Sequence, residues 1–131
     1  MQEVSEAPLV AEITSGGLTD KMIAHAEKNP DRVALRRRVG ETWQDVTSAQ
    51  FRDEVAGLAK GLIAAGVGAG DRIAIMSSTR YEWTLADYAG WFAGATVVPI
   101  YETSSAEQVE WILSNADCAG VFLEGDKHKR V

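Results

Sequence analysis

The sequence is poor in the residues that form disulfides and bind metal ions. Of its 131 residues, only Cys118 is a cysteine, and only His25 and His128 are histidines. A single cysteine excludes an internal disulfide framework, and so few soft ligands argue against a zinc site. Cysteine usage of this kind fits a reducing compartment, so we expect a cytoplasmic location.

The sequence also lacks a basic surplus and a long apolar run. Its formal net charge is −6, whereas proteins that bind nucleic acid need basic surface. No uninterrupted apolar stretch reaches the roughly 20 residues that span a bilayer. The opening "MQEVSEAPLVAEITSGG" has neither the basic start nor the apolar stretch of a signal peptide. We therefore expect no nucleic-acid partner and no transmembrane segment, while peripheral membrane contact stays open.

Polarity and periodicity divide the chain into an arm and one domain. Residues 1–17 are polar and end in glycine, which predicts a flexible N-terminal arm. The apolar spacing from Leu18 predicts a helix to Lys28. The stretch "RVALRRRVGETWQDVT" predicts a β-hairpin that turns at Gly40-Glu41. We assign residues 18–131 to one domain.

Three short apolar runs dominate the rest of the chain, at 72–76, 96–100 and 119–123. Such runs are typical of strands buried on both faces. A helical pattern lies between each pair, so the segment is a β-α-β-α-β unit with parallel strands. The predicted fold class is α/β: a hairpin and helix, followed by part of a doubly wound sheet. The last strand lies close to Val131 with no helix after it, so we expect the N-terminal piece of a longer protein.

Capping-box patterns predict where three helices begin. A capping box pairs a Ser or Thr at the cap with a Glu or Gln three residues later. The pattern occurs at Thr47 and Gln50, at Thr79 and Glu82, and at Ser104 and Glu107.

Several stretches are candidates for binding an anion or a ligand. Glycines 66, 68 and 70 in "GVGAG" lie between a helix and a strand, the reverse of a phosphate loop, so they predict a helix end and a turn. The stretch "SSTRYEW" (77–83) follows a strand, and its amides either hold an anion or are satisfied by Thr79 and Glu82. "PIYETSS" (99–105) lies where open α/β sheets bind ligands, so Tyr101 and Thr103 either line a cleft or are ordinary loop residues. "KHKR" (127–130) is a compact basic patch, which is either a solvated end or a site for a polyanion such as a nucleotide phosphate.

An ordered series of short motifs resembles the N-terminal region of AMP-forming acyl-CoA synthetases, in the adenylate-forming enzyme superfamily. The likeness runs from about Leu18 to the end, and Tyr101 with Glu107-Gln108 favours the long-chain fatty acid–CoA ligase branch. The matching positions are Gly61-Leu62, Gly66-Val67, Gly70-Asp71-Arg72-Ile73-Ala74-Ile75, Glu82-Trp83, Ala93-Gly94-Ala95, Val98-Pro99-Ile100-Tyr101, Thr103 and Glu107-Gln108-Val109.

The resemblance implies a ligase of fatty-acid and lipid metabolism that acts in two steps. A fatty acid and ATP would give an acyl-adenylate and pyrophosphate, with Mg²⁺ assisting at the phosphates. Coenzyme A would then displace AMP to give the thioester. The implied partners are these small molecules and the remainder of the same chain. A fatty acyl–AMP ligase, which omits the second step, and a non-catalytic interaction module remain alternatives.

The resemblance places no catalytic or metal-binding residue in this sequence. The family's phosphate loop, which ends in Pro-Lys-Gly, has no counterpart here, so the domain over 18–131 is expected to stop before it. By analogy with the acetyl-CoA branch, Lys129, Arg130, Tyr101 and Thr103 are the candidates for the wall of a coenzyme A passage. Without the missing motifs we expect the 131-residue chain alone to be inactive.

Overall fold

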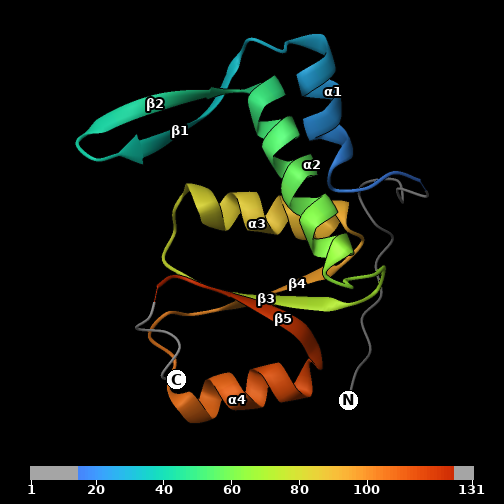
Figure 1. Ribbon diagram of the computed structural model, residues 1–131, viewed down its shortest axis with the longest axis vertical. Coiled ribbons are helices and arrows are strands. Elements are labelled where there is room, and N and C mark those ends of the chain that lie inside the picture. The colour runs from blue at the N-terminus through green and yellow to red at the C-terminus, as the bar shows by residue number, and fades with distance from the viewer. Residues whose placement is uncertain (1–14, 126–131) are drawn as a thin grey trace, which may run out of the picture.

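The computed structural model describes residues 15–125 and combines a hairpin unit with a parallel sheet (Figure 1). Along the chain, the elements are α1 (Asp20–Lys28), β1 (Val33–Val39), β2 (Thr42–Thr47), α2 (Ser48–Ala64), β3 (Arg72–Met76), α3 (Tyr81–Phe92), β4 (Thr96–Ile100), α4 (Ala106–Asn115) and β5 (Cys118–Leu123). Strands β1 and β2 pair antiparallel around Gly40, whose φ is +60°. The predicted hairpin is therefore confirmed. No helix among these described residues is long and apolar enough to cross a membrane.

The sheet has the strand order β4-β3-β5, and both neighbours run parallel to β3. After β4 the chain returns past β3, so the winding direction reverses. Helices α3 and α4 consequently lie on opposite faces of the sheet, and α2 packs outside α3 (Figure 1). This arrangement confirms the predicted α/β class with a doubly wound parallel sheet.

Only one of the three predicted capping boxes forms as predicted. At Thr47 the hydroxyl accepts from the Gln50 amide, and the Gln50 side chain accepts from the Thr47 amide. The box expected at Ser104 is wrong by one residue, because Ser105 and Gln108 form it instead. The prediction at Thr79 is also wrong.

Helix α3 begins later than that pattern predicts. Arg80 occupies its N-cap position without a capping side chain. The carboxylate of Glu82 does not reach back to the cap amide, because it binds the Arg80 guanidinium instead. A charged partner two residues away has displaced the expected backbone cap.

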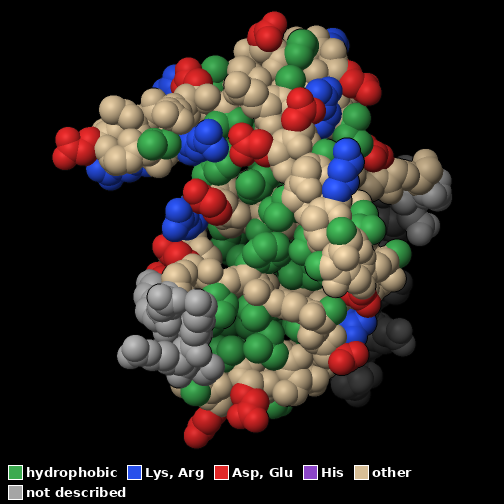
Figure 2. All heavy atoms as spheres, viewed as in Figure 1, with side chains coloured by type: hydrophobic (Ala, Val, Ile, Leu, Met, Phe, Trp, Pro, Cys, Tyr) green, Lys and Arg blue, Asp and Glu red, His purple; other side chains and the backbone are tan. Residues whose placement is uncertain are grey.

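The prediction that all three strands are buried on both faces holds only for β3. Its residues Ile73–Met76 are buried, whereas β4 and β5 carry exposed positions, among them Val121 at 41%. Strands β4 and β5 are the edges of this three-stranded sheet. Figure 2 shows hydrophobic side chains on both sides of β5, between the sheet and α3 and between the sheet and α4. The apolar sequence of an edge strand therefore does not guarantee its burial.

The glycines of "GVGAG" end α2 and turn the chain, as predicted. Gly66 has φ +99° and donates to the Ile63 carbonyl, while the Val67 amide donates to the Leu62 carbonyl. This pair of bonds is the Schellman arrangement, which satisfies the last carbonyls of a helix. Gly70, at φ +88°, donates to the Gly94 carbonyl at the start of β3.

Two apolar clusters hold the layers together. Ala74, Met76, Ile100 and Val109 pack between the sheet and α4. The second cluster, Val46, Phe51 and Val55, joins the hairpin unit to α3. On the other face of the sheet, a Cβ at Gly90 would lie 2.7 Å from a Val97 methyl. Helix α3 thus approaches the sheet closely through its small residues, as the sequence predicts.

Candidate functional site

The carboxyl ends of the three parallel strands bring polar residues together. Met76, Ile100 and Leu123 share one register across the sheet. The loop after β3 leads to α3 on one face, and the loop after β4 leads to α4 on the other. Loops that diverge in this way leave a crevice between them, which is where open α/β sheets bind ligands.

A groove lies at this crevice. It has a volume of about 380 Å³ and is lined from the β3 loop by Ser77–Thr79, from α3 by Trp83, and from β4 and its loop by Pro99–Glu102. Tyr101 is 86% exposed and also lines a second hollow, against Trp111 of α4. We call the first hollow the switch-point groove. Its size lies in the range of small-molecule sites.

The structure describes two of the four residues expected in the coenzyme A passage, and these two lie in different places. Tyr101 lines the switch-point groove, which is the first of the two alternatives that its position after a parallel strand left open. Thr103 is exposed in the following turn and lines neither of the two hollows. Lys129 and Arg130 fall outside the described residues, as does the rest of the basic patch. Of the two candidates that the structure describes, Tyr101 lines the groove and Thr103 does not.

The loop after β3 does bind an anion, and the anion belongs to the chain itself. One oxygen of the Glu124 carboxylate accepts from the Ser78 amide at 2.8 Å and from the Ser78 hydroxyl at 2.5 Å. The Ser77 hydroxyl lies 3.2 Å from the same oxygen, and the Arg80 guanidinium pairs with the other at 3.1 Å. We call Ser77, Ser78, Arg80 and Glu124 the carboxylate clasp.

The clasp has a clear electrostatic consequence. Hydrogen bonds from the Ser78 hydroxyl and amide lower the pKa of Glu124 to about 2, with smaller contributions from Ser77 and Arg80. The Arg80 guanidinium also lowers the pKa of Glu82 by hydrogen bonding to it. Both carboxylates are therefore ionised at neutral pH, and the Ser78 amide already has an acceptor. The acceptor is Glu124, which neither of the two alternatives for "SSTRYEW" includes.

Glu124 is a site residue that the predictions from sequence do not include, although a signal was present. Glu124 follows β5 directly, as Ser77 follows β3, and β5 is the strand next to β3. A carboxylate and a serine pair at the ends of neighbouring parallel strands must lie close together. Recognising this requires the strand order, which the spacing of apolar runs does not reveal.

A second polar network lies between the hairpin and α3. The Tyr81 hydroxyl donates to the Glu54 carboxylate at 2.9 Å, and the Arg37 guanidinium lies 5.5 Å from the Tyr81 ring centroid. Burial and the hydrogen bond to Glu54 raise the pKa of Tyr81 far above its usual value. The phenol therefore stays protonated and acts as a donor that joins α2 to α3.

The described residues contain no group of three or more His, Cys, Asp or Glu side chains able to hold a metal ion. Residues 15–125 therefore do not fit a Mg²⁺ site. What this part of the chain offers chemically is a groove, a tyrosine at its wall and an internal anion clasp.

Comparison with known proteins agrees with the resemblance of the motif series. The family model described as AMP-binding enzyme matches residues 23–131. A long-chain-fatty-acid–CoA ligase of Mycobacterium bovis, FadD15, is 47% identical over 104 residues, which cover 79% of this chain and 17% of that protein. The ligase ACSBG2 of Xenopus laevis, which carries the same description, is 31% identical over 76% of this chain and 14% of its own length.

Solved structures agree at the level of the fold. The fatty acyl-adenylate ligase of Legionella pneumophila, solved with acyl adenylate and pyrophosphate, superposes with a TM-score of 0.76. It is 22% identical and is matched over 86% of this chain and 20% of its own. The chain thus spans about a fifth or less of these relatives. The match of residues 23–131 to the family model, with the identity to these ligases, shows that the chain belongs to the AMP-binding enzyme family.

Proposed function

We propose that the protein acts as a long-chain fatty acid–CoA ligase, of which residues 18–131 form the N-terminal part of the large domain. The observation that carries the proposal is the 47% identity to a protein described as a long-chain-fatty-acid–CoA ligase. ATP, coenzyme A and a fatty acid are then the substrates, and the cytoplasm is where the reaction takes place.

The proposed reaction has two steps. The fatty-acid carboxylate attacks the α-phosphorus of ATP, and the bond to the β-phosphate oxygen breaks, which releases pyrophosphate. The sulfur of coenzyme A then attacks the acyl carbonyl, loses its proton, and AMP leaves with the bonding electron pair. Mg²⁺ would neutralise charge at the phosphates, held by residues other than 15–125.

Within this reaction the described residues serve to bind and position substrate. The switch-point groove lies between two diverging loops, and the exposed Tyr101 ring forms part of its wall. An aromatic ring of this kind packs well against a thin, partly apolar chain such as pantetheine. We assign Tyr101 to the coenzyme A passage and keep Thr103, Lys129 and Arg130 as further candidates, because the resemblance to the acetyl-CoA branch implies them.

The proposal is tested first on the gene and then on its product. Downstream of Val131 we expect codons for a Ser/Thr/Gly-rich loop that ends in Pro-Lys-Gly, and a stop codon there would contradict the proposal. The full-length product should convert a C16 acid, ATP and coenzyme A to the thioester. Formation of acyl-adenylate without thioester would identify a fatty acyl–AMP ligase instead.

The role of Tyr101 has its own test. Tyr101→Ala should raise the KM for coenzyme A about fivefold, on the order of 1 kcal/mol of lost ring contact, and leave the KM for ATP unchanged. Tyr101→Phe should restore binding if the ring and not the hydroxyl provides the contact. Trp43→Ala, a similar truncation on the distant hairpin, should change neither constant. Equal changes in both constants would contradict the assignment.

A further inference from the structure

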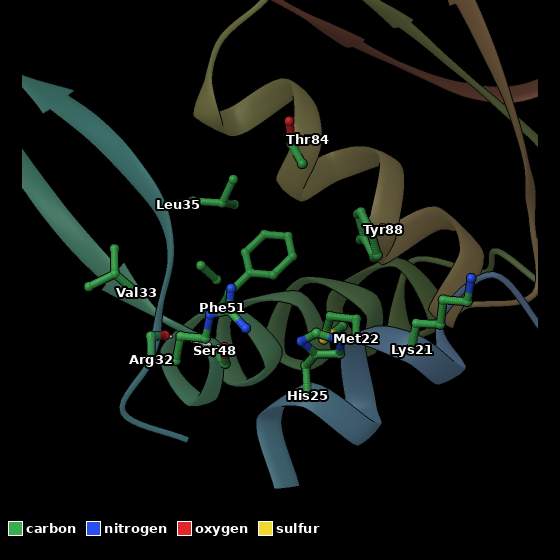
Figure 3. A pocket seen from close by; sticks show the side chains of 11 residues that line it. Lys21, Met22, His25, Arg32, Val33, Leu35, Ser48, Phe51, Thr84 and Tyr88 are labelled. Carbon is green, nitrogen blue, oxygen red and sulfur yellow. Dashed lines mark hydrogen bonds between the residues drawn. The ribbon is translucent and has the colours of Figure 1, made fainter. Parts of the chain in front are cut away.

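A separate hollow lies between α1, β1, α2 and α3, away from the switch-point groove. Its volume is about 360 Å³, and Figure 3 shows side chains from all four elements around it. Its lining consists of Lys21, Met22, His25, Arg32, Val33, Ala34, Leu35, Ser48, Phe51, Thr84 and Tyr88. None of these residues takes part in the carboxylate clasp or lines the switch-point groove. We call this space the α1 hollow.

The floor of the α1 hollow is apolar and firmly packed. Phe51 is only 4% exposed and makes an edge contact with the Tyr88 ring, with centroids 5.3 Å apart. Met22 and Leu35 pack against the same cluster from α1 and β1. Because the floor belongs to a core cluster, the hollow needs no rearrangement of these side chains before it can accept a ligand.

The acidic and basic side chains around this floor are all of one kind, because every one of them is basic. Lys21, His25 and Arg32 line the hollow, and its lining includes no acidic residue, although the whole chain is acidic. Within residues 15–125, no ion pair or side-chain hydrogen bond engages these three basic groups. By contrast, Arg36 and Arg37 in the neighbouring hairpin groove pair with Asp45 and Glu54.

Arg32 is held where it can meet a ligand. Its carbonyl accepts from the Ser48 amide at 2.8 Å and from the Ser48 hydroxyl at 3.2 Å, which fixes its backbone beside the start of α2. Arg32 and His25 line the hollow together with Phe51, and Figure 3 shows their side chains around it. A guanidinium offers paired N–H donors to an oxyanion, and an imidazole N–H adds another.

We propose that the α1 hollow is a binding site for a small amphipathic anion. The anionic head lies between Arg32 and His25, and the apolar tail lies over Phe51, Tyr88, Met22 and Leu35. One water molecule occupies roughly 30 Å³ in the liquid, so a hollow of about 360 Å³ has the volume of about a dozen waters and suits a ligand of similar size. A sulfate or carboxylate with an alkyl chain of about eight carbons has this size. The site lies apart from the switch-point groove, and its test measures binding alone, so the outcome does not depend on the proposed reaction.

The test is a titration of the 131-residue chain with octyl sulfate, below the concentration at which micelles form. Isothermal titration calorimetry should show one saturable site, and amide NMR signals of residues around Met22, His25 and Phe51 should shift. Octyltrimethylammonium, which has the same tail and the opposite charge, should not bind, and 1-octanol should bind more weakly. Absence of saturable octyl sulfate binding would overturn the proposal.

Two kinds of variant locate the site. Arg32→Gln should weaken octyl sulfate binding about two- to fivefold, as expected for a partly exposed ion pair. Lys60→Gln makes the same charge change on the exposed surface of α2 and should leave the affinity unchanged. Thr84→Phe should fill the hollow from α3 and abolish binding, and Ala34→Phe should do so from β1. Thermal unfolding identifies which of these two variants is folded.

Equal effects of Arg32→Gln and Lys60→Gln would show nonspecific attraction and would overturn the proposal. So would octanol binding as tightly as octyl sulfate, because the head group would then contribute nothing. Unchanged binding to a folded Thr84→Phe or Ala34→Phe protein would place the site elsewhere.

Discussion

The carboxylate clasp and the α1 hollow both present donors to an anion, and of these two only the clasp has an anion supplied by residues 15–125. In the carboxylate clasp, the donors of Ser78 and Arg80 surround the carboxylate of Glu124. In the α1 hollow, Arg32 and His25 face a cavity, and no acidic side chain lines it. The two places are built on different elements, yet each lies beside an apolar cluster.

The charges of the clasp stabilise the fold, whereas those of the α1 hollow stay available to bind a ligand. The clasp joins the end of β5 to the loop after β3, so its anion contributes to holding two neighbouring strands. A donor set that the chain satisfies internally has little left to offer a ligand. A donor set without an internal partner keeps that capacity. Whether a cluster of basic side chains indicates a binding site therefore depends on the partners that it already has within the chain.

The largest effect should come from the apolar floor of the α1 hollow. Phe51 is 4% exposed and contacts the Tyr81 and Tyr88 rings. Phe51→Ala should lower the free energy of unfolding by about 3–5 kcal/mol, measured by urea denaturation. Trp43→Ala, which truncates a ring that is 66% exposed, should change it by less than about 0.5 kcal/mol. Similar losses for the two variants would show that the hollow has no rigid floor.

Breaking the clasp should have the next largest effect. Glu124→Gln removes the charge that Ser78 and Arg80 share, so the Tm should fall by several degrees at neutral pH. The folded pKa of Glu124, about 2, lies below the roughly 4.3 of an unfolded glutamate. The stabilisation is therefore complete above the unfolded value and is lost as the pH falls toward 2.

The pH profile of the Tm difference between wild type and Glu124→Gln checks this prediction. The difference should be largest near neutral pH, should shrink as the pH falls below about 4.3, and should be smallest near pH 2, where about half of Glu124 is protonated. Glu110→Gln, on the exposed surface of α4, is the matched control and should give a small difference throughout. A difference for Glu124→Gln that does not depend on pH would contradict a role for its charge.

Emptying the clasp should make it resemble the α1 hollow. Glu124→Ala leaves the Ser78 amide, two hydroxyls and the Arg80 guanidinium without their carboxylate. Added sulfate should then raise the Tm of this variant more than that of the wild type, at ionic strength matched with chloride. Adding Ser78→Ala should reduce the gain. If sulfate stabilises both proteins equally, the loop binds anions only nonspecifically.

The sequence was sufficient to predict the elements and their class because those depend on local patterns. Apolar runs located β3, β4 and β5, and the Thr47 capping box marked the start of α2. Gly66 was correctly assigned to a helix end, since its place between helix and strand settles the question. These predictions required no knowledge of which strands lie side by side.

Features that depend on neighbours in space were beyond that reasoning. The exposure of Val121 follows from β5 being an edge, and the failed cap at Thr79 follows from the pairing of Arg80 with Glu82. The clasp needs the order β4-β3-β5, and the α1 hollow needs four elements to converge. That Tyr101 follows a parallel strand can be read from the sequence, but only the structure shows that it lines the groove.

The smallest effect should separate the guanidinium of the clasp from its serine donors. The Arg80 side chain is 45% exposed and divides its pairing between Glu82 and Glu124, so solvent screens both interactions. Arg80→Gln should therefore lower the Tm less than Glu124→Gln does, and the loss should shrink further in high salt. A double-mutant cycle of Arg80→Gln with Glu124→Gln should give a smaller coupling than one of Ser78→Ala with Glu124→Gln. The reverse order would mean that long-range charge, and not the short hydrogen bonds of Ser78, holds β5 to the loop after β3.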